Sequence, residues 1–236
     1  MSLVHTAAPG AVESAARALA QQLAGALRPG LPAPSLREFA DGPAGPARAL
    51  GAVRGMGADV LAPFLLAGHP LTSEDTAVLR AAVSAYPAPE DGADDRGLWA
   101  ARDEGLVRAL GRLGVDAADW EGLAEGPDGT QPGGGWADWA ATMVRHSPLA
   151  LPPLDGPVRA AARERRTDLT HGMVRAMLRR DHLGAARLGR WLALDDAAAP
   201  EPLLPSALRH LAVLAEDQPR VVFETAVAAE FLGGGR

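Results

Sequence analysis

The chain has 236 residues, of which 47% are hydrophobic, and its formal net charge is −6 at pH 7. This length and apolar content suffice for a sizeable core in one large domain or two small ones, and they exclude bulk disorder. The sequence contains no Cys, which excludes disulfides, thiolate metal sites and cysteine nucleophiles.

The composition also indicates the kind of genome and the compartment. Lys, Ile and Asn, whose codons are AT-rich, are absent, so we expect the protein of a GC-rich bacterium. The exclusive use of Arg over Lys therefore follows from codon supply as readily as from a need to bind anions. The N-terminus does not resemble a secretory signal, and the longest apolar run, 60–67, is too short to cross a bilayer. We expect a cytoplasmic protein without a membrane span.

The first part of the chain predicts helices separated by Gly- and Pro-rich turns. Ala and Leu recur at helical spacing, whereas strand-forming residues are scarce. A capping-box pattern, Thr72-x-x-Asp75, marks one helix start, and Pro87 marks its end. The expected helical ranges are 11–27, short pieces within 31–57, 57–67, 71–87, 95–113 and 116–124.

The segment 125–135, EGPDGTQPGGG, is the clearest break in the chain. Its glycines and its lack of large apolar residues are typical of a linker or a mobile lid. We therefore divide the chain into an N-terminal helical part, 1–125, a flexible segment, 126–135, and a C-terminal helical part, 136–236. The two helical parts can still pack as one domain.

Six further helices are expected in the C-terminal part, over 136–146, 157–165, 167–179, 185–194, 205–216 and 221–232. The whole pattern predicts an all-α fold without significant β-sheet. We expect a single domain, either a bundle or an orthogonal array, of about eight to ten helices.

The segment 165–184 concentrates more ionisable side chains than any other part of the sequence. At about 100° per residue, Asp168 and His171 lie on one helix face, and Arg175 lies one turn beyond them. A carboxylate beside an imidazole orients it and raises its basicity. The pair therefore predicts an acid–base site in which Arg175 or Arg179 holds a substrate anion.

A metal site is not predicted in this segment. His182 lies eleven residues after His171, about 16 Å along an unbroken helix, so the two cannot share one ion. Metal sites in helical bundles use carboxylate-x-x-His pairs on two helices, and the sequence holds only the single pair of Asp168 and His171. We therefore expect neither a metal nor a cofactor.

The same helix also fits a solvated surface. Its apolar arc consists of Leu169, Met173, Ala176 and Met177, and His171 faces away from that arc. The default expectation is that the polar side chains of this helix point into solvent, and a face that lines a cleft is the alternative.

The charge distribution favours a docking surface in the same region. Nine arginines against three acidic residues give 159–190 a formal charge of +6. Such asymmetry is typical of a surface that binds phosphate, carboxylate or an acidic partner. The alternative is that these arginines pair with acidic residues elsewhere in the chain, notably Asp91, Asp94, Asp95, Asp103 and Glu104. Nucleic acid is not favoured, because the sequence pI is about 5.5.

Two hypotheses of function follow. The first is a non-catalytic accessory protein that docks an anionic small molecule or an acidic protein or peptide. Trp136 and Trp139 stand at i and i+3 after the flexible segment, where they either anchor the core or form a stacking wall. The binding residues of this hypothesis are Arg175, Arg179, His182, Trp136 and Trp139. The second hypothesis is an enzyme that processes a small molecule or peptide, with His171 and Asp168 as its catalytic pair. A homodimer is compatible with either.

Overall fold

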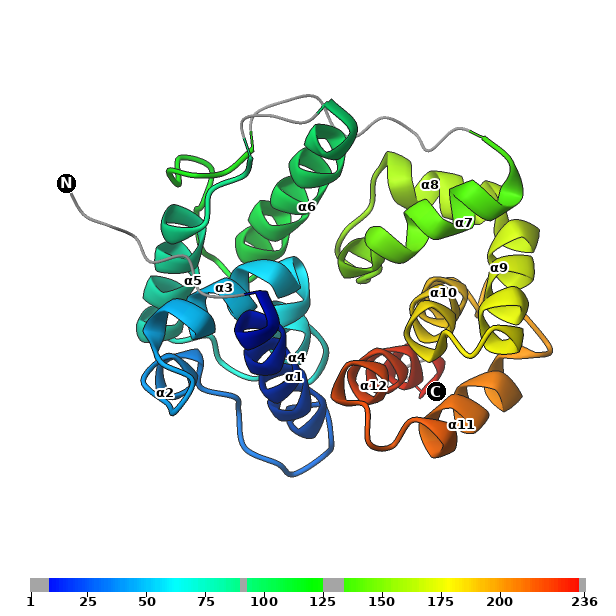
Figure 1. The fold of residues 1–236 in the computed structure, drawn as a ribbon, viewed down its shortest axis with the longest axis horizontal. Coiled ribbons are helices and arrows are strands. Elements are labelled where there is room, and N and C mark those ends of the chain that lie inside the picture. Colours follow the sequence, from blue (N-terminus) through cyan, green and yellow to red (C-terminus); the bar gives the residue numbers. More distant parts are fainter. Residues whose placement is uncertain (1–8, 90–92, 125–133, 234–236) are drawn as a thin grey trace. The chain divides into compact units, whose positions relative to one another are not determined.

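The computed structural model describes residues 9–89, 93–124 and 134–233, and it contains helices and turns without any β-strand in these ranges (Figure 1). Helices make up about 70% of the described residues, so the all-α prediction is confirmed. The predicted single domain is not confirmed, because the chain divides into two compact units, Met1–Asp128 (unit 1) and Gly129–Arg236 (unit 2).

Unit 1 is built around α3, which packs against α1, α5 and the 3-10 helix η1, while η1 in turn packs against α6. Helices α1, α5 and α6 begin and end within two residues of the predicted positions, whereas α3 is an eleven-residue helix where only short pieces were expected. The described helices of this unit are α1 (Pro9–Ala26), α2 (Leu36–Ala40), α3 (Pro46–Met56), η1 (Gly57–Leu61), α4 (Ala62–Leu66), α5 (Ser73–Ala85) and α6 (Ala93–Arg112).

The predicted capping box at the start of α5 is confirmed, and it has a second role. The Thr72 hydroxyl accepts a hydrogen bond from the Asp75 backbone N–H at 3.1 Å, and the Asp75 carboxylate accepts one from the Thr72 backbone N–H at 3.3 Å. The other Asp75 oxygen accepts a hydrogen bond from the Leu36 backbone N–H at 2.8 Å. Because Asp75 is buried, this bond fixes the start of α2 against α5.

The helix predicted over 116–124 is wrong, because this segment forms turns. Gly122 has φ of +97°, a backbone region that L side chains rarely adopt. A Cβ atom at Gly122 would lie 2.6 Å from the Val83 carbonyl oxygen, and the Gly122 oxygen accepts a hydrogen bond from the Ala88 backbone N–H. Packing against the end of α5 therefore overrides local helix propensity. The flexible segment predicted over 126–135 lies outside the described residues except for 134–135.

One stretch of unit 1, Pro46–Leu66, has the length and hydropathy of a membrane span. It combines α3, η1 and α4. Within the most apolar 18 residues of this stretch, 78% are buried inside the protein, so its apolar side chains supply the core of unit 1.

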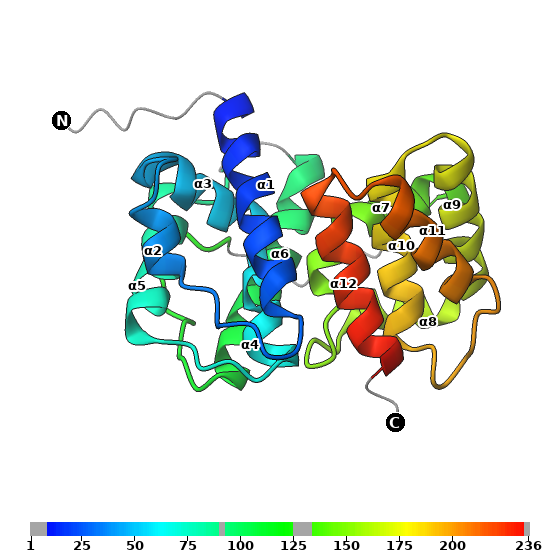
Figure 2. The ribbon, with the colours of Figure 1, turned by 90° about the horizontal axis from the view of Figure 1, so that it is seen from below.

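Unit 2 is built around α10, which packs against α9, α12, α11 and α7 (Figures 1 and 2). Every predicted helix of this part is present, with bounds within three residues of those expected. Its described helices are α7 (Trp136–Arg145), the 3-10 helix η2 (Ser147–Leu149), α8 (Pro157–Glu164), α9 (Arg166–Leu178), α10 (His182–Leu194), α11 (Leu204–Leu214) and α12 (Pro219–Gly233).

A close approach between α7 and α9 fixes the position of α9. A Cβ atom at Gly172 would lie 2.6 Å from the Ala140 Cβ atom and 3.0 Å from a Leu188 methyl group, so only glycine fits there. The neighbouring Leu169 and Met173 are buried. This contact places the apolar side of α9 against α7 and α10 and leaves the opposite side exposed.

Candidate functional site

Six of the nine arginines in 159–190 form ion pairs with carboxylates inside unit 2. Arg159 and Arg163 pair with Asp195, Arg165 with Asp168, Arg166 with Asp196, and both Arg187 and Arg190 with Glu224. Two of the acidic partners expected from the sequence are instead used in unit 1, where Asp103 pairs with Arg54 and Glu104 with Arg108. Most of the arginines of 159–190 are therefore engaged by carboxylates of the same unit.

The carboxylate of Asp195 binds two of these arginines, Arg159 and Arg163. One Asp195 oxygen lies 2.9 Å from an Arg159 nitrogen and 3.1 Å from an Arg163 nitrogen. Burial acts to raise the pKa of Asp195, but the hydrogen bonds and charges of Arg159 and Arg163 outweigh it and hold that pKa below its ordinary range. Both arginines therefore face an ionised carboxylate at neutral pH.

The Arg190–Glu224 pair is fully buried between α10 and α12. The Arg190 guanidinium donates to Glu224 at 2.9 Å and to the Ala150 carbonyl oxygen at 2.9 Å, and Arg187 donates to the other Glu224 oxygen at 3.0 Å. Neither Arg190 nor Glu224 is exposed to solvent. These charges hold helices together and do not face a partner.

Three arginines remain: Arg175, Arg179 and Arg180. All three are exposed, and none has a carboxylate partner among the residues that the structure describes. They occupy the last turn of α9 and the two residues after it. The unpaired positive charge of 159–190 is thus gathered at the C-terminal end of one helix.

An aromatic side chain adjoins this charge. The Arg175 guanidinium carbon lies 5.4 Å from the centroid of the Trp136 ring, close enough for a cation–π interaction. The His171 ring contacts the same indole edge to face, with centroids 5.8 Å apart and planes at 71°. Trp136 is 39% exposed, so its indole is held in place and still reachable from solvent.

Two large apolar side chains share this face of α9. Leu178 is 80% exposed and Val174 is 37% exposed. At about 100° per residue, both lie within about 60° of His171 around the helix. We call the set formed by Trp136, His171, Val174, Arg175, Leu178, Arg179 and Arg180 the α9 surface.

The structure separates the predicted acid–base pair. The Asp168 carboxylate accepts a hydrogen bond from Arg165 at 2.8 Å, and no hydrogen bond joins Asp168 to His171, although the structure describes both. His171 is exposed and contacts Trp136 instead. The geometry of a carboxylate that orients a general base is therefore absent at this pair.

Two other residues predicted to bind a ligand do not contact the Trp136 indole. Trp139 is fully buried, with the Arg165 guanidinium 4.5 Å from its ring centroid, so it anchors the core. His182 is half-buried at the first position of α10, after the chain turns at Arg180. His171 and Arg175 both contact the Trp136 indole, and Arg179 follows on the same side of α9.

The sequence argument missed Val174, Leu178 and Arg180. The first two could have been found on the same helical wheel, because they follow His171 at i+3 and i+7. Arg180 is among the nine arginines counted in 159–190, but its backbone φ of +59°, in the turn that ends α9, has no signal in the sequence. A non-glycine residue in this left-handed region costs about 1–2 kcal/mol.

No group of His, Asp or Glu side chains suited to a metal ion occurs in the described ranges. Three pockets formed by described residues lie in unit 1, and none of them includes a residue of the α9 surface. Comparison of the chain with protein-family models, with characterised proteins and with solved structures finds no match.

Proposed function

We propose that the protein is a non-catalytic binding protein whose α9 surface docks an acidic polypeptide segment that also carries apolar side chains. The observation that supports this most directly is the coincidence of unpaired charge and exposed apolar area. Arg175, Arg179 and Arg180 lack carboxylate partners in the described part of the chain, and Leu178 beside them is 80% exposed. Electrostatic complementarity with an acidic partner supplies specificity and association rate, and apolar contact supplies affinity.

The shape and composition of the surface favour a polypeptide over a small anion. Small ligands bind in concave pockets that bury most of their surface, whereas the α9 surface is the exposed side of a helix. Four of its seven residues are Trp or Arg, two of the types enriched among the residues that dominate binding at protein interfaces. Stacking of Arg175 on Trp136 also orders both side chains before a partner arrives.

The enzyme hypothesis has less support. Its carboxylate, Asp168, is engaged by Arg165, and its imidazole, His171, stands on an exposed helix face. In the docking proposal, His171 supports the Trp136 indole and takes no part in proton transfer.

Binding of a fluorescein-labelled peptide rich in Asp, Glu and Leu tests the proposal by fluorescence anisotropy. We expect the double variant Arg175→Ala/Arg179→Ala to bind about 5- to 30-fold more weakly than the wild type, since two exposed charge pairs contribute about 0.5–1 kcal/mol each. Arg209→Ala is the matched control, because Arg209 is an exposed arginine of the same unit without a carboxylate partner among described residues. We expect it to bind like the wild type.

Two further measurements complete the design: the salt dependence of binding, and a variant that removes an apolar side chain without changing the charge. Raising the ionic strength from about 0.1 M to about 1 M shortens the screening length from about 10 Å to about 3 Å, so the wild-type affinity should fall. Leu178→Ser should weaken binding without changing its salt dependence. Absence of binding at low salt, or an equal loss in Arg209→Ala, contradicts the proposal. An activity that His171→Ala abolishes would favour the enzyme hypothesis instead.

A further inference from the structure

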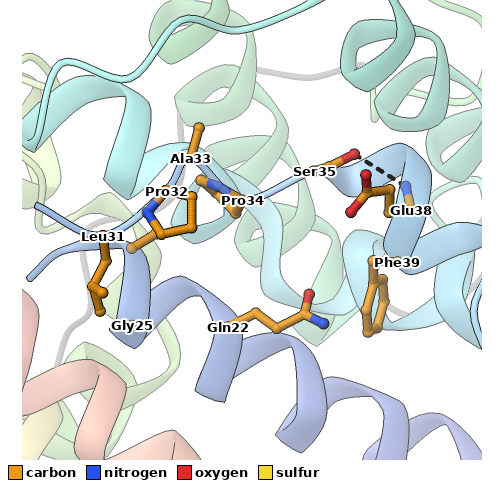
Figure 3. A pocket seen from close by; sticks show the side chains of 10 residues that line it. Gln22, Gly25, Leu31, Pro32, Ala33, Pro34, Ser35, Glu38 and Phe39 are labelled. Carbon is orange, nitrogen blue, oxygen red and sulfur yellow. Dashed lines mark hydrogen bonds between the residues drawn. The ribbon is translucent and has the colours of Figure 1, made fainter.

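Unit 1 contains a pocket of about 460 Å³ between the C-terminal end of α1 and the start of α2 (Figure 3). Gln22, Gly25 and Ala26 of α1 form one wall, the segment 31–35 forms the second, and Glu38 and Phe39 of α2 close the third. Its volume falls within the range of small-molecule sites, about 300–1,000 Å³. No residue of the α9 surface takes part in it.

The second wall of this pocket is pre-organised. Gly30 turns the chain with φ of +78°, and Pro32 and Pro34 then restrict the backbone of the wall. The wall ends at Ser35, whose hydroxyl accepts a hydrogen bond from the Glu38 backbone N–H at 3.1 Å. The next residue, Leu36, is tied to buried Asp75. A pocket fixed in this way loses little entropy when a ligand enters.

The chemistry of the lining favours a cation. Glu38 is its single charged residue, and it forms no ion pair in the described part of the chain. The neighbouring Arg37 is engaged by Asp41 at 2.7 Å. Figure 3 shows the Glu38 carboxylate turned toward the segment 31–35 and the Gln22 side chain extending toward Phe39.

The charge around the pocket also favours a cation. The C-terminal end of α1, where carbonyl groups carry partial negative charge, borders it. Residues 1–128 contain ten arginines against seventeen acidic residues, a formal charge of −7. Apart from the uncharged polar side chains of Gln22 and Ser35, the rest of the lining is apolar, with Leu31, the two prolines and Phe39 as its largest side chains.

We infer that this pocket binds a small organic cation: a primary ammonium group attached to an apolar body about the size of an aromatic ring. The ammonium group pairs with Glu38, and the apolar body lies against Leu31, Pro32 and Phe39. This site is independent of the α9 surface, so either proposal can fail without the other.

Titration of the full-length protein with 2-phenylethylamine, followed by ¹H–¹⁵N chemical shifts, tests the inference. We expect shifts centred on 22–39 and tighter binding of the amine than of 2-phenylethanol or phenylacetate, which share the ring and differ in charge. A ratio of about three- to fivefold between amine and alcohol matches one exposed ion pair. Equal binding of the three compounds, or shifts centred elsewhere, overturns the inference.

Two pairs of variants separate the pocket from its charge. Gly25→Leu should abolish binding, because a side chain there enters the pocket and its Cβ atom meets no other atom within 4 Å. Gly111→Leu, in the last turn of α6 with equally open space, is the control. Glu38→Gln should reduce amine affinity to that of the alcohol, whereas Glu74→Gln, an exposed carboxylate outside the lining, should not.

Three results contradict the assignment. The first is unchanged amine binding in Gly25→Leu, and the second is equal loss in Glu38→Gln and Glu74→Gln. The third concerns the source of the ammonium group: a lysine-containing peptide that binds more tightly than 2-phenylethylamine would replace the small amine with a basic polypeptide as the ligand.

Discussion

Glu224→Gln is expected to lower the free energy of unfolding of unit 2 by about 3–5 kcal/mol. The substitution keeps the shape of the side chain but removes the carboxylate charge that faces Arg190, which is fully buried and also bonded to the Ala150 carbonyl. Arg187 loses its carboxylate at the same time. An uncompensated buried cation is costly because the protein interior cannot solvate it. Native-state hydrogen exchange of amides in α10 and α12 measures the loss.

The pH dependence gives a second readout of the same pair. Burial acts to raise the pKa of Glu224, but the charges of Arg190 and Arg187 outweigh it and hold that pKa below its ordinary range. The pair therefore stabilises the folded state fully above the unfolded-state pKa of about 4.3, and this contribution is lost as the pH falls further. The difference between wild type and Glu224→Gln should shrink accordingly in acid.

Glu230→Gln is the matched control for this prediction. Glu230 lies on the same helix, α12, and is half-exposed. It forms no ion pair with an arginine among the described residues. We expect its effect to stay within about 0.5 kcal/mol. If the amides of α10 and α12 are equally protected from hydrogen exchange in Glu224→Gln and Glu230→Gln, the buried pair does not stabilise unit 2.

Asp103→Asn should destabilise unit 1 by a similar amount, about 3–5 kcal/mol. Asp103 and Arg54 are 2% and 4% exposed, and both terminal guanidinium nitrogens, Nη1 and Nη2, bind the carboxylate, the second at 2.8 Å. Arg54 also donates to the Tyr86 carbonyl at 2.9 Å, and Asp103 accepts from the Ala124 backbone N–H at 2.8 Å. One buried pair thus connects α3, α6, the end of α5 and the turn segment after α6.

The adjacent residue provides the control for Asp103→Asn. Glu104 pairs with Arg108 on the exposed side of α6, an i,i+4 pair that contributes about 0.3–0.5 kcal/mol. Hydrogen exchange in α3 and α6 should therefore change greatly in Asp103→Asn and little in Glu104→Gln. If the two substitutions accelerate exchange equally, the buried pair has been assigned too large a contribution.

The helices were predictable because their signals are local. Ala and Leu at helical spacing, the capping box at Thr72 and the turns at Gly and Pro placed most helices within three residues. The exception, 116–124, depends on Gly122 packing against Val83, a contact between residues far apart in the sequence. The start of α10 was placed three residues late, because the Asp181 side chain caps it by accepting from the Gly184 N–H.

The candidate site was predictable only in part, because charge counts do not show which charges are paired. Half of the +6 of 159–190 is cancelled by Asp195, Asp196 and Glu224, which lie beyond that segment. Their proximity to the arginines depends on how α8, α9, α10 and α12 pack. What the sequence indicated correctly was the exposed side of α9, since its apolar arc is the side that packs against α7 and α10.

The docking proposal is tested most directly by Arg180→Gly, measured for both stability and peptide affinity. Arg180 holds a left-handed backbone, with φ of +59°, that glycine adopts without strain. Glycine is also the common residue at this position after a helix. We therefore expect the free energy of unfolding to stay unchanged or rise by up to about 1 kcal/mol, while affinity for the acidic peptide falls severalfold. Unchanged affinity, or a parallel loss of stability and affinity, would contradict the assignment of the α9 surface as the docking site.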